Sequence, residues 1–287
     1  MASADMKDIK RRIKSVSSTM QITKAMELVA SSKLRKAKER AESATLFFET
    51  LYETMREITA ENSTFRSIYY NNREVKTVMM IVIAGDRGLA GGYNTNALKL
   101  AQRKIDEAAQ KSDVVVIPIG KKAVEYFEKR SYRVVAKYEC IAENIRMNAA
   151  KEIGAKIMAS FKNGNVDKVE LIYTDYVSPL VQEARHKEII PLESVSDKKH
   201  RDVQTSYEPS AEQLFDLIIP QYIAGVLYGT IADSFASEQA ARRIAMENAS
   251  DNADEMISNL SLLYNRARQS TITQEITEIV SGASAQE

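Results

Sequence analysis

The chain has 287 residues, of which 44% are hydrophobic and 28% charged, and its formal net charge is +1. This length accommodates one or two domains, and the composition is that of a soluble folded chain rather than a disordered one or an overall polyanion binder. The single Cys140 excludes an intramolecular disulfide framework, and neither His186 nor His200 has a metal-ligand spacing with it. We therefore expect no zinc site and no Ser–His–Asp triad, and also no signal peptide and no bilayer-spanning run.

The N-terminal segment carries a repeat with alternating steps of four and three residues. Its positions are Ile9, Ile13, Val16, Met20, Thr23, Glu27, Ala30, Leu34, Ala37, Ala41, Ala44, Phe48, Leu51, Met55 and Ile58. Only Thr23 and Glu27 are not apolar, and such a seven-residue repeat is typical of a left-handed coiled coil. Because residues 3–84 contain no Gly or Pro, the sequence predicts one helix to about residue 60. A helix of this length needs a partner, since packing supplies most of its stability.

The first 40 residues are basic, with eleven Lys or Arg against four Asp or Glu. Several of these side chains flank the repeat positions Ile9 and Ile13, namely Lys7, Lys10, Arg11, Arg12 and Lys14. Basic tracts can bind nucleic acid, but no aromatic residues interleave here for base stacking. A solvated or protein-contacting helix face is the favoured interpretation. A coiled-coil adaptor on nucleic acid is an alternative, which a steep salt dependence of binding would support.

The middle of the chain alternates strand and helix patterns. We expect strands at 75–84, 114–119, 132–138 and 169–174, an edge strand within 181–192, and helices at 95–110, 121–129 and 145–161. The first strand is almost continuously apolar, as in a strand buried on both faces. This alternation predicts a parallel, Rossmann-like α/β domain.

A glycine-rich loop, residues 86–94, follows the first strand and precedes a helix, which invites a phosphate-binding interpretation. It lacks the Lys-Ser/Thr of a P-loop and a clean G-x-G-x-x-G, and Asp86 places negative charge where phosphate would sit. A tight turn that uses glycine for positive φ is favoured. An enzyme whose α/β domain binds a nucleotide, with the helices serving oligomerisation, stays open as a second hypothesis.

The C-terminal segment, residues 210–280, again has a helical pattern. We expect its apolar seam at Ala253, Met256, Leu260, Leu263 and Ala267, followed by Ile272, Ile276, Ile279 and Ala283. Small residues would allow close helix approach, namely Ala240, Ala241, Ala245 and Ala249. Pro220 should break or kink the helix near its start. We predict that the two terminal helices form an antiparallel coiled coil, although pairing between chains is not excluded by the pattern. The expected domains are 1–60, 74–195 and 209–287.

Three stretches occur in the order typical of one family, namely 9–26 running on to 33–37, 86–94, and 237–253 followed by 264–276. Together they resemble the gamma subunit of F-type ATP synthases, the central rotor stalk. Ala90 stands where many members have Cys, and Ser250 where Thr is usual. The inserted cysteine-bearing loop of plastid forms is not seen, so a bacterial enzyme is expected. This resemblance implies an antiparallel coiled coil with a Rossmann-like domain at its base.

The resemblance also implies a non-catalytic, cofactor-free role. The coil would rotate inside a ring of three alpha and three beta subunits, and the globular foot, with epsilon, would sit on the c-ring. Rotation would couple proton (or sodium) flow to ATP synthesis or hydrolysis at the cytoplasmic face of the bacterial membrane, without insertion into it and without nucleic acid. By resemblance, Met26, Arg87, Arg268 and Gln269 would contact a beta subunit. Tyr207 and Glu208 would approach the c-ring and epsilon.

Overall fold

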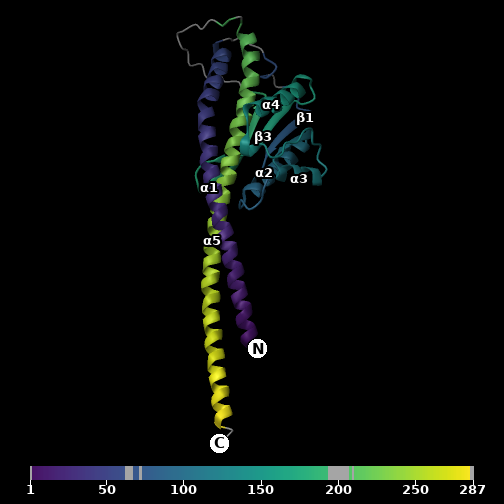
Figure 1. Ribbon diagram of the computed structural model, residues 1–287. Helices are drawn as coiled ribbons and strands as arrows, with labels where there is room; N and C mark the ends of the chain where they lie inside the picture. Colours follow the sequence, from purple (N-terminus) through teal and green to yellow (C-terminus); the bar gives the residue numbers. More distant parts are fainter. Residues whose placement is uncertain (1, 62–66, 71–72, 193–206, 209, 285–287) are drawn as a thin grey trace. The chain divides into compact units, whose positions relative to one another are not determined.

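The computed structural model describes residues 2–61, 67–70, 73–192, 207–208 and 210–284. Two helices are exceptionally long, α1 (Ala2–Glu61) and α5 (Ala211–Ser284) (Figure 1). The chain divides into two compact units, and both long helices contribute to each. The first unit is the helix pair of residues 1–30 and 242–287. The second comprises residues 31–241 and contains the sheet.

The second unit is built on a four-stranded sheet of order β2-β1-β3-β4. Its elements are β1 (Thr77–Ile83), α2 (Tyr93–Ala109), β2 (Asp113–Ile119), α3 (Lys121–Lys129), the 3₁₀ turn η1 (Ala142–Asn144), α4 (Met147–Lys162), β3 (Lys168–Tyr176) and β4 (Gln182–Ile190). The first three strands run parallel, and β4 pairs antiparallel with β3. The Rossmann-like prediction is thereby confirmed, with an antiparallel edge strand added to it.

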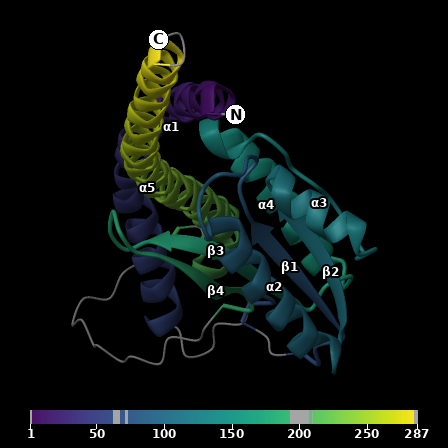
Figure 2. The same cartoon turned by 90° about the horizontal axis from the view of Figure 1, so that it is seen from below.

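Strand β1 lies between β2 and β3 in the sheet (Figure 2). Its side chains alternate between the two faces of the sheet and are buried on both. Val78, Met80 and Val82 pack with α2 and α3, in a cluster that includes Phe127. Met79, Ile81 and Ile83 belong to the opposite cluster, to which α4 and the adjoining parts of α1 and α5 contribute. A central parallel strand covered on both sides explains its uninterrupted apolar sequence.

The expected strand at 132–138 is wrong. Only two isolated bridges join this segment to β2, Val116 to Val134 and Ile119 to Tyr138. Its side chains alternate between exposed and half-buried, so no second layer covers it. A β-rich pattern at the margin of a sheet predicts extension but does not ensure a continuous ladder of hydrogen bonds.

Pro220 does not break the last helix, which continues through it, so the expected break is not found. The proline is exposed, whereas Ile219, Tyr222 and Ile223 beside it are buried in the core. Their packing offsets the one intrahelical bond that proline removes. By length and composition α5 is also apolar enough to cross a membrane, which corrects the expectation that no such run exists. A partly buried core helix passes the same test, so this is weak evidence for a span.

In the first unit, α1 and α5 run in opposite directions, which confirms antiparallel pairing within one chain (Figure 1). Thr23 and Ala30 of α1 are buried, as predicted, and the hydroxyls of Thr23 and Ser250 lie 2.6 Å apart. On α5 the covered positions from residue 246 onward include a series with steps of four and three, with Ala249 and Ser261 half-buried beside it; the series is Met246, Ser250, Ala253, Ile257, Leu260, Tyr264, Ala267 and Thr271. The seam therefore keeps the predicted heptad period.

In the first part of the predicted α5 seam two positions are wrong, because Met256 is 52% exposed and Leu263 50% exposed. Each lies one residue before a covered position, Ile257 or Tyr264, so about 100° around the helix separates the two. The later predicted positions Ile272, Ile276 and Ile279 are exposed as well. The apolar pattern alone could not fix which of several apolar stripes faces α1.

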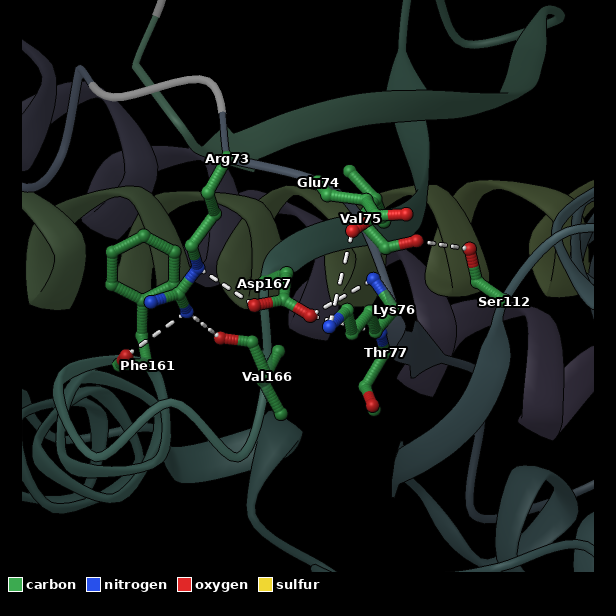
Figure 3. Close-up of polar contacts among 9 residues, drawn as sticks. All are labelled: Arg73, Glu74, Val75, Lys76, Thr77, Ser112, Phe161, Val166 and Asp167. Carbon is green, nitrogen blue, oxygen red and sulfur yellow. Dashed lines mark hydrogen bonds and ion pairs between the residues drawn. The ribbon is translucent and has the colours of Figure 1, made fainter.

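Arg73, Asp167 and their hydrogen-bond partners form a polar clip, which holds the chain where it joins the sheet (Figure 3). Arg73 pairs with Asp167 at 2.7 Å, donates to the carbonyls of Phe161 and Val166, and lies 4.4 Å from the centre of the Phe161 ring. Asp167 also accepts the backbone N–H groups of Lys76 and Thr77. One ion pair thus ties the start of β1 to the segment before β3.

Candidate partner-contact surfaces

The carboxyl edge of the parallel strands is where open α/β sheets generally bind ligands. Here α5 occupies that edge. A Cβ added at Gly85, just after β1, would lie 2.9 Å from the carboxyl carbon of Glu238. Ser234 accepts the N–H of Thr174 at 3.1 Å, and Ser237 donates to the Thr174 carbonyl at 3.2 Å. A polar stretch of the chain's own helix therefore fills the place of a ligand.

The polar side chains of the glycine-rich loop form hydrogen bonds with nearby backbone groups of the same chain. Asn94 accepts the Gly85 N–H at 2.8 Å and donates to the Arg87 carbonyl at 3.1 Å. Asp86 accepts two backbone N–H groups, from Lys121 at the start of α3 and from Cys140, each at 2.9 Å. Of the loop glycines only Gly91 has positive φ, +53°. The predicted turn role is seen at that position, whereas Gly85 is needed for close approach.

Arg87 is exposed at this loop, and so is Leu89, whose side chain is 65% exposed. The backbone of Arg87 is held by Asn94, so the side chain extends from a fixed turn. An anchored turn carrying a cation and an apolar side chain is suited to contact with another protein. The assignment of Arg87 to a beta-subunit contact stays a prediction.

The first unit presents apolar side chains away from its seam. On α1, Ile22, Leu28 and Val29 are 60%, 70% and 54% exposed, and Met26 among them is half-buried. On α5 the exposed apolar residues are Met256, Leu262, Leu263, Ile272, Ile276, Ile279 and Val280. Apolar surface in this quantity marks an interaction site.

Arg268 and Gln269 lie on the same part of α5, and both are exposed. Their neighbours Ala267 and Thr271 are half-buried in the helix pair. We expected that at most one of the pair could approach the seam, and neither does. Both side chains are available to an outside partner, as is the basic stretch from Lys7 to Lys14 near the start of α1.

Tyr207 and Glu208, in the second unit, differ in environment. Tyr207 is half-buried and packs against the main hydrophobic cluster, whereas Glu208 is exposed. The carboxylate is therefore the better placed of the two for a partner. Their assignment to the c-ring and epsilon stays a prediction.

Two acidic residues that the sequence reasoning missed lie together near the carboxyl end of β3. Asp233 of α5 and Asp175 of β3 share a side-chain hydrogen bond, and burial together with that bond raises the pKa of Asp233 to about 7. The sequence signal was a polar run, residues 233–234 and 237–239, directly after the apolar stretch 222–232 of this helix. Polar residues at buried positions require partners, and here β3 supplies them.

A second polar network crosses β3 and β4. Glu170 bonds His186 at 2.8 Å and Lys168 at 2.6 Å, and Lys168 also reaches Glu188. Burial alone would raise the pKa of Glu170, but the bonds from His186 and Lys168 outweigh it and lower the pKa to about 2. Within the part of the chain that the structure describes, no group of three His, Cys, Asp or Glu residues could hold a metal ion. His200 lies outside the described residues.

Comparison with known proteins assigns the family. The profile described as ATP synthase matches residues 5–286. The ATP synthase gamma chain of Ruminococcus albus is 56% identical over 98% of both chains, and the sodium ion specific gamma chain of Acetobacterium woodii is 43% identical over 98% of both.

Solved structures agree on the fold. A chain of the Euglena gracilis mitochondrial ATP synthase has a TM-score of 0.70 at 16% identity, covering 99% of this chain and 95% of its own. A chain of the Tetrahymena thermophila mitochondrial ATP synthase central stalk and c-ring has a TM-score of 0.63 at 24% identity, covering 80% and 99%. Sequence and fold together place this chain in the gamma-chain family of ATP synthases.

Proposed function

We propose that this chain is the central rotor subunit of a bacterial F-type ATP synthase and is itself non-catalytic. Its paired helices would turn inside the ring of alpha and beta subunits, and its sheet-containing unit would bind epsilon and the c-ring. The gamma-chain relatives, identical at up to 56% over nearly the whole length, are the observation that carries this proposal.

The surface of the helix pair supports a role inside a ring of partners. A stable two-helix coil needs only its seam to be apolar, yet Ile22, Leu28 and Val29 are also exposed. The same holds for the last third of α5, where Ile276 and Ile279 are 56% and 72% exposed. Surrounding subunits would cover this surface, and Met26, Arg268 and Gln269 lie along it.

The carboxyl edge of the sheet supports a mechanical role over an enzymatic one. Ser234, Ser237 and Glu238 of α5 occupy the edge where a nucleotide would bind. The same contacts join the sheet to a long helix, as transmission of torque requires. The free chain is therefore expected to give no saturable nucleotide binding in a titration. Stoichiometric binding at micromolar nucleotide would favour the enzyme hypothesis.

Co-purification of the native complex tests the proposal directly. The expected result is recovery of the chain with alpha, beta, epsilon and c subunits from detergent-solubilised membranes, identified by mass spectrometry. Recovery from the soluble fraction without these subunits would contradict both the function and the proposed location on the cytoplasmic face of the membrane.

Orientation of the foot can be tested by crosslinking. Glu208→Cys is exposed and should crosslink to cysteines in the c-ring loops, whereas Tyr207→Cys should react less because Tyr207 is half-buried. Glu212→Cys, exposed in the first turn of α5, is a matched control for reactivity. Labelling of all three with crosslinks from none would refute this placement.

We propose protons as the coupling ion, although the relative from Acetobacterium woodii is named sodium ion specific. ATP-driven acidification by reconstituted complexes, measured with and without Na⁺, separates the two ions. Acidification that is independent of Na⁺ supports protons. Na⁺-dependent ATP hydrolysis without acidification would assign sodium.

A further inference from the structure

The end of β3 is fastened to α5 by a continuous set of polar contacts, all within the second unit. Ser234 and Ser237 bond the backbone of Thr174, and Asp233 accepts the N–H of Tyr176 at 3.2 Å. Two residues of β3, Thr174 and Tyr176, are thus held by about one turn of α5. On the other side, Lys38 of α1 lies 5.0 Å from the centre of the Tyr176 ring.

Asp175, the residue between these two, carries a carboxyl group within hydrogen-bonding reach of that of Asp233. Two ionised carboxylates have only acceptors, so a hydrogen bond between these two groups requires that one of them hold a proton. Arg185 of β4 pairs with Asp175 at 2.7 Å, so the position of this cation favours placing the shared proton on Asp233. Burial and this hydrogen bond raise the pKa of Asp233 to about 7.

The charges around the pair cannot neutralise a second carboxylate. Arg185 is also bonded to Glu183 at 3.1 Å, so its single positive charge already faces two carboxylates. Burial and the charge of Asp175 raise the pKa of Tyr173 beside them, so this phenol stays neutral. The amine of Lys38 lies over Tyr176. Loss of the proton from Asp233 would therefore place two negative charges in contact.

We propose that Asp175 and Asp233 share one proton near neutral pH and that its loss weakens the attachment of α5 to β3. The joint between the sheet and the long helix is then a pH-sensitive element of the fold. The proposal concerns the chain itself and stands independently of its role in an ATP synthase.

The direction of the effect follows from proton linkage. In the unfolded chain the carboxyl group of Asp233 ionises at its ordinary pKa of 3.8, whereas in the folded chain it ionises at about 7. The folded state therefore binds more protons between these values, and the free energy of unfolding falls as pH rises through this interval and levels off above about 7. A conventional paired carboxylate gives the opposite slope.

Hydrogen exchange on the full-length chain tests the joint locally. After correction for intrinsic exchange, protection of the Tyr176 amide should fall by up to about tenfold per pH unit between about pH 5 and 7 and then level off. Asp233→Asn, whose amide can donate to Asp175 without titrating, should remove this slope. Asp216→Asn, exposed on the same helix, should retain it.

A third variant predicts a shift rather than a loss. Arg185→Gln removes the cation that favours ionisation, so the pH at which protection levels off should rise. A wild-type slope that persists in Asp233→Asn, or a flat profile in the wild type, would overturn the proposal. If Asp233→Asn does not fold, infrared spectroscopy of the wild type with ¹³C-labelled aspartate decides. A protonated carboxyl band that titrates near neutral pH supports the shared proton, and its absence refutes it.

Discussion

Replacing Arg73 with alanine tests the polar clip that joins β1 to the segment before β3. The guanidinium pairs with Asp167 at 2.7 Å, donates to two backbone carbonyls and covers the Phe161 ring. All these contacts come from a single side chain, so Arg73→Ala removes them together (Figure 3). The variant should destabilise the sheet-containing unit without altering the surfaces proposed for partners.

The magnitude follows from exposure and charge. A hydrogen bond to a charged group contributes about 1.5–3 kcal/mol, and Arg73, at 36% exposed, is screened enough to place its pair at the lower end. Asp167 is 11% exposed but keeps the N–H groups of Lys76 and Thr77, which limits the penalty for its lost cation. With the carbonyl bonds and the aromatic contact, the total is about 2–3 kcal/mol. The melting temperature should fall by roughly 5–10 °C.

The chain lacks tryptophan, so urea unfolding is best followed by circular dichroism, with hydrogen exchange of the Thr77 amide as the local readout. Arg73→Lys keeps the charge but not the planar fork and should lose about half as much. Arg103→Ala is the matched control, since its Nε lies 3.9 Å from Glu107 but the arginine is 68% exposed. It should change stability by less than about 0.5 kcal/mol. If Arg73→Ala is no more destabilising than Arg103→Ala, the clip does not stabilise the sheet.

Three further predictions concern coupling, backbone and acid stability. Arg268→Ala with Gln269→Ala should weaken ATP-driven pumping relative to ATPase rate, or weaken assembly, while the free chain stays folded. If the double variant pumps and assembles like the wild type, neither residue takes part in the contact that transmits force to the ring. Gly120→Ala should lower the free energy of unfolding in urea by more than about 3 kcal/mol, because φ at Gly120 is +95° and the new Cβ would lie 1.9 Å from the Ala84 carbonyl oxygen. Unchanged stability would contradict this backbone conformation at Gly120. The Glu170 network should stabilise the chain above pH 4.5, and this stabilisation should be lost as pH falls toward about 2. Glu170→Gln should therefore reduce the fall of the melting temperature with decreasing pH. An unaltered fall would argue against the network.

The sequence predicted most of the regular elements because each pattern reflects a local rule. The uninterrupted apolar run of β1 indicated a strand buried on both faces, and the helix predicted at 121–129 has the same bounds as α3. The heptad period predicted both long helices, and Thr23 and Ala30 lie on the seam as expected. Period and composition are properties of a segment, so they can be read before its neighbours are known.

Tertiary structure decided which side of each element is used. Met256 and Ile257 are both apolar, and only the position of α1 determines that the second is covered. Segment 132–138 bends at Val135 and remains outside the sheet, because its two isolated bridges to β2 do not form a continuous ladder. Pro220 is tolerated because buried residues around it hold the helix.

The contact between β3 and α5 could not be predicted from the sequence, because it too depends on residues far apart in the chain. Asp175 and Asp233 are 58 positions apart, and neither lies in a recognisable motif. Their shared proton arises from burial, a mutual hydrogen bond and the position of Arg185, which only the folded arrangement brings together. Local sequence patterns therefore determined the helices, the strands and the family resemblance. Long-range contacts determined which residues form the seam, the covering of the carboxyl edge of the sheet by α5, and the charge of the carboxyl pair.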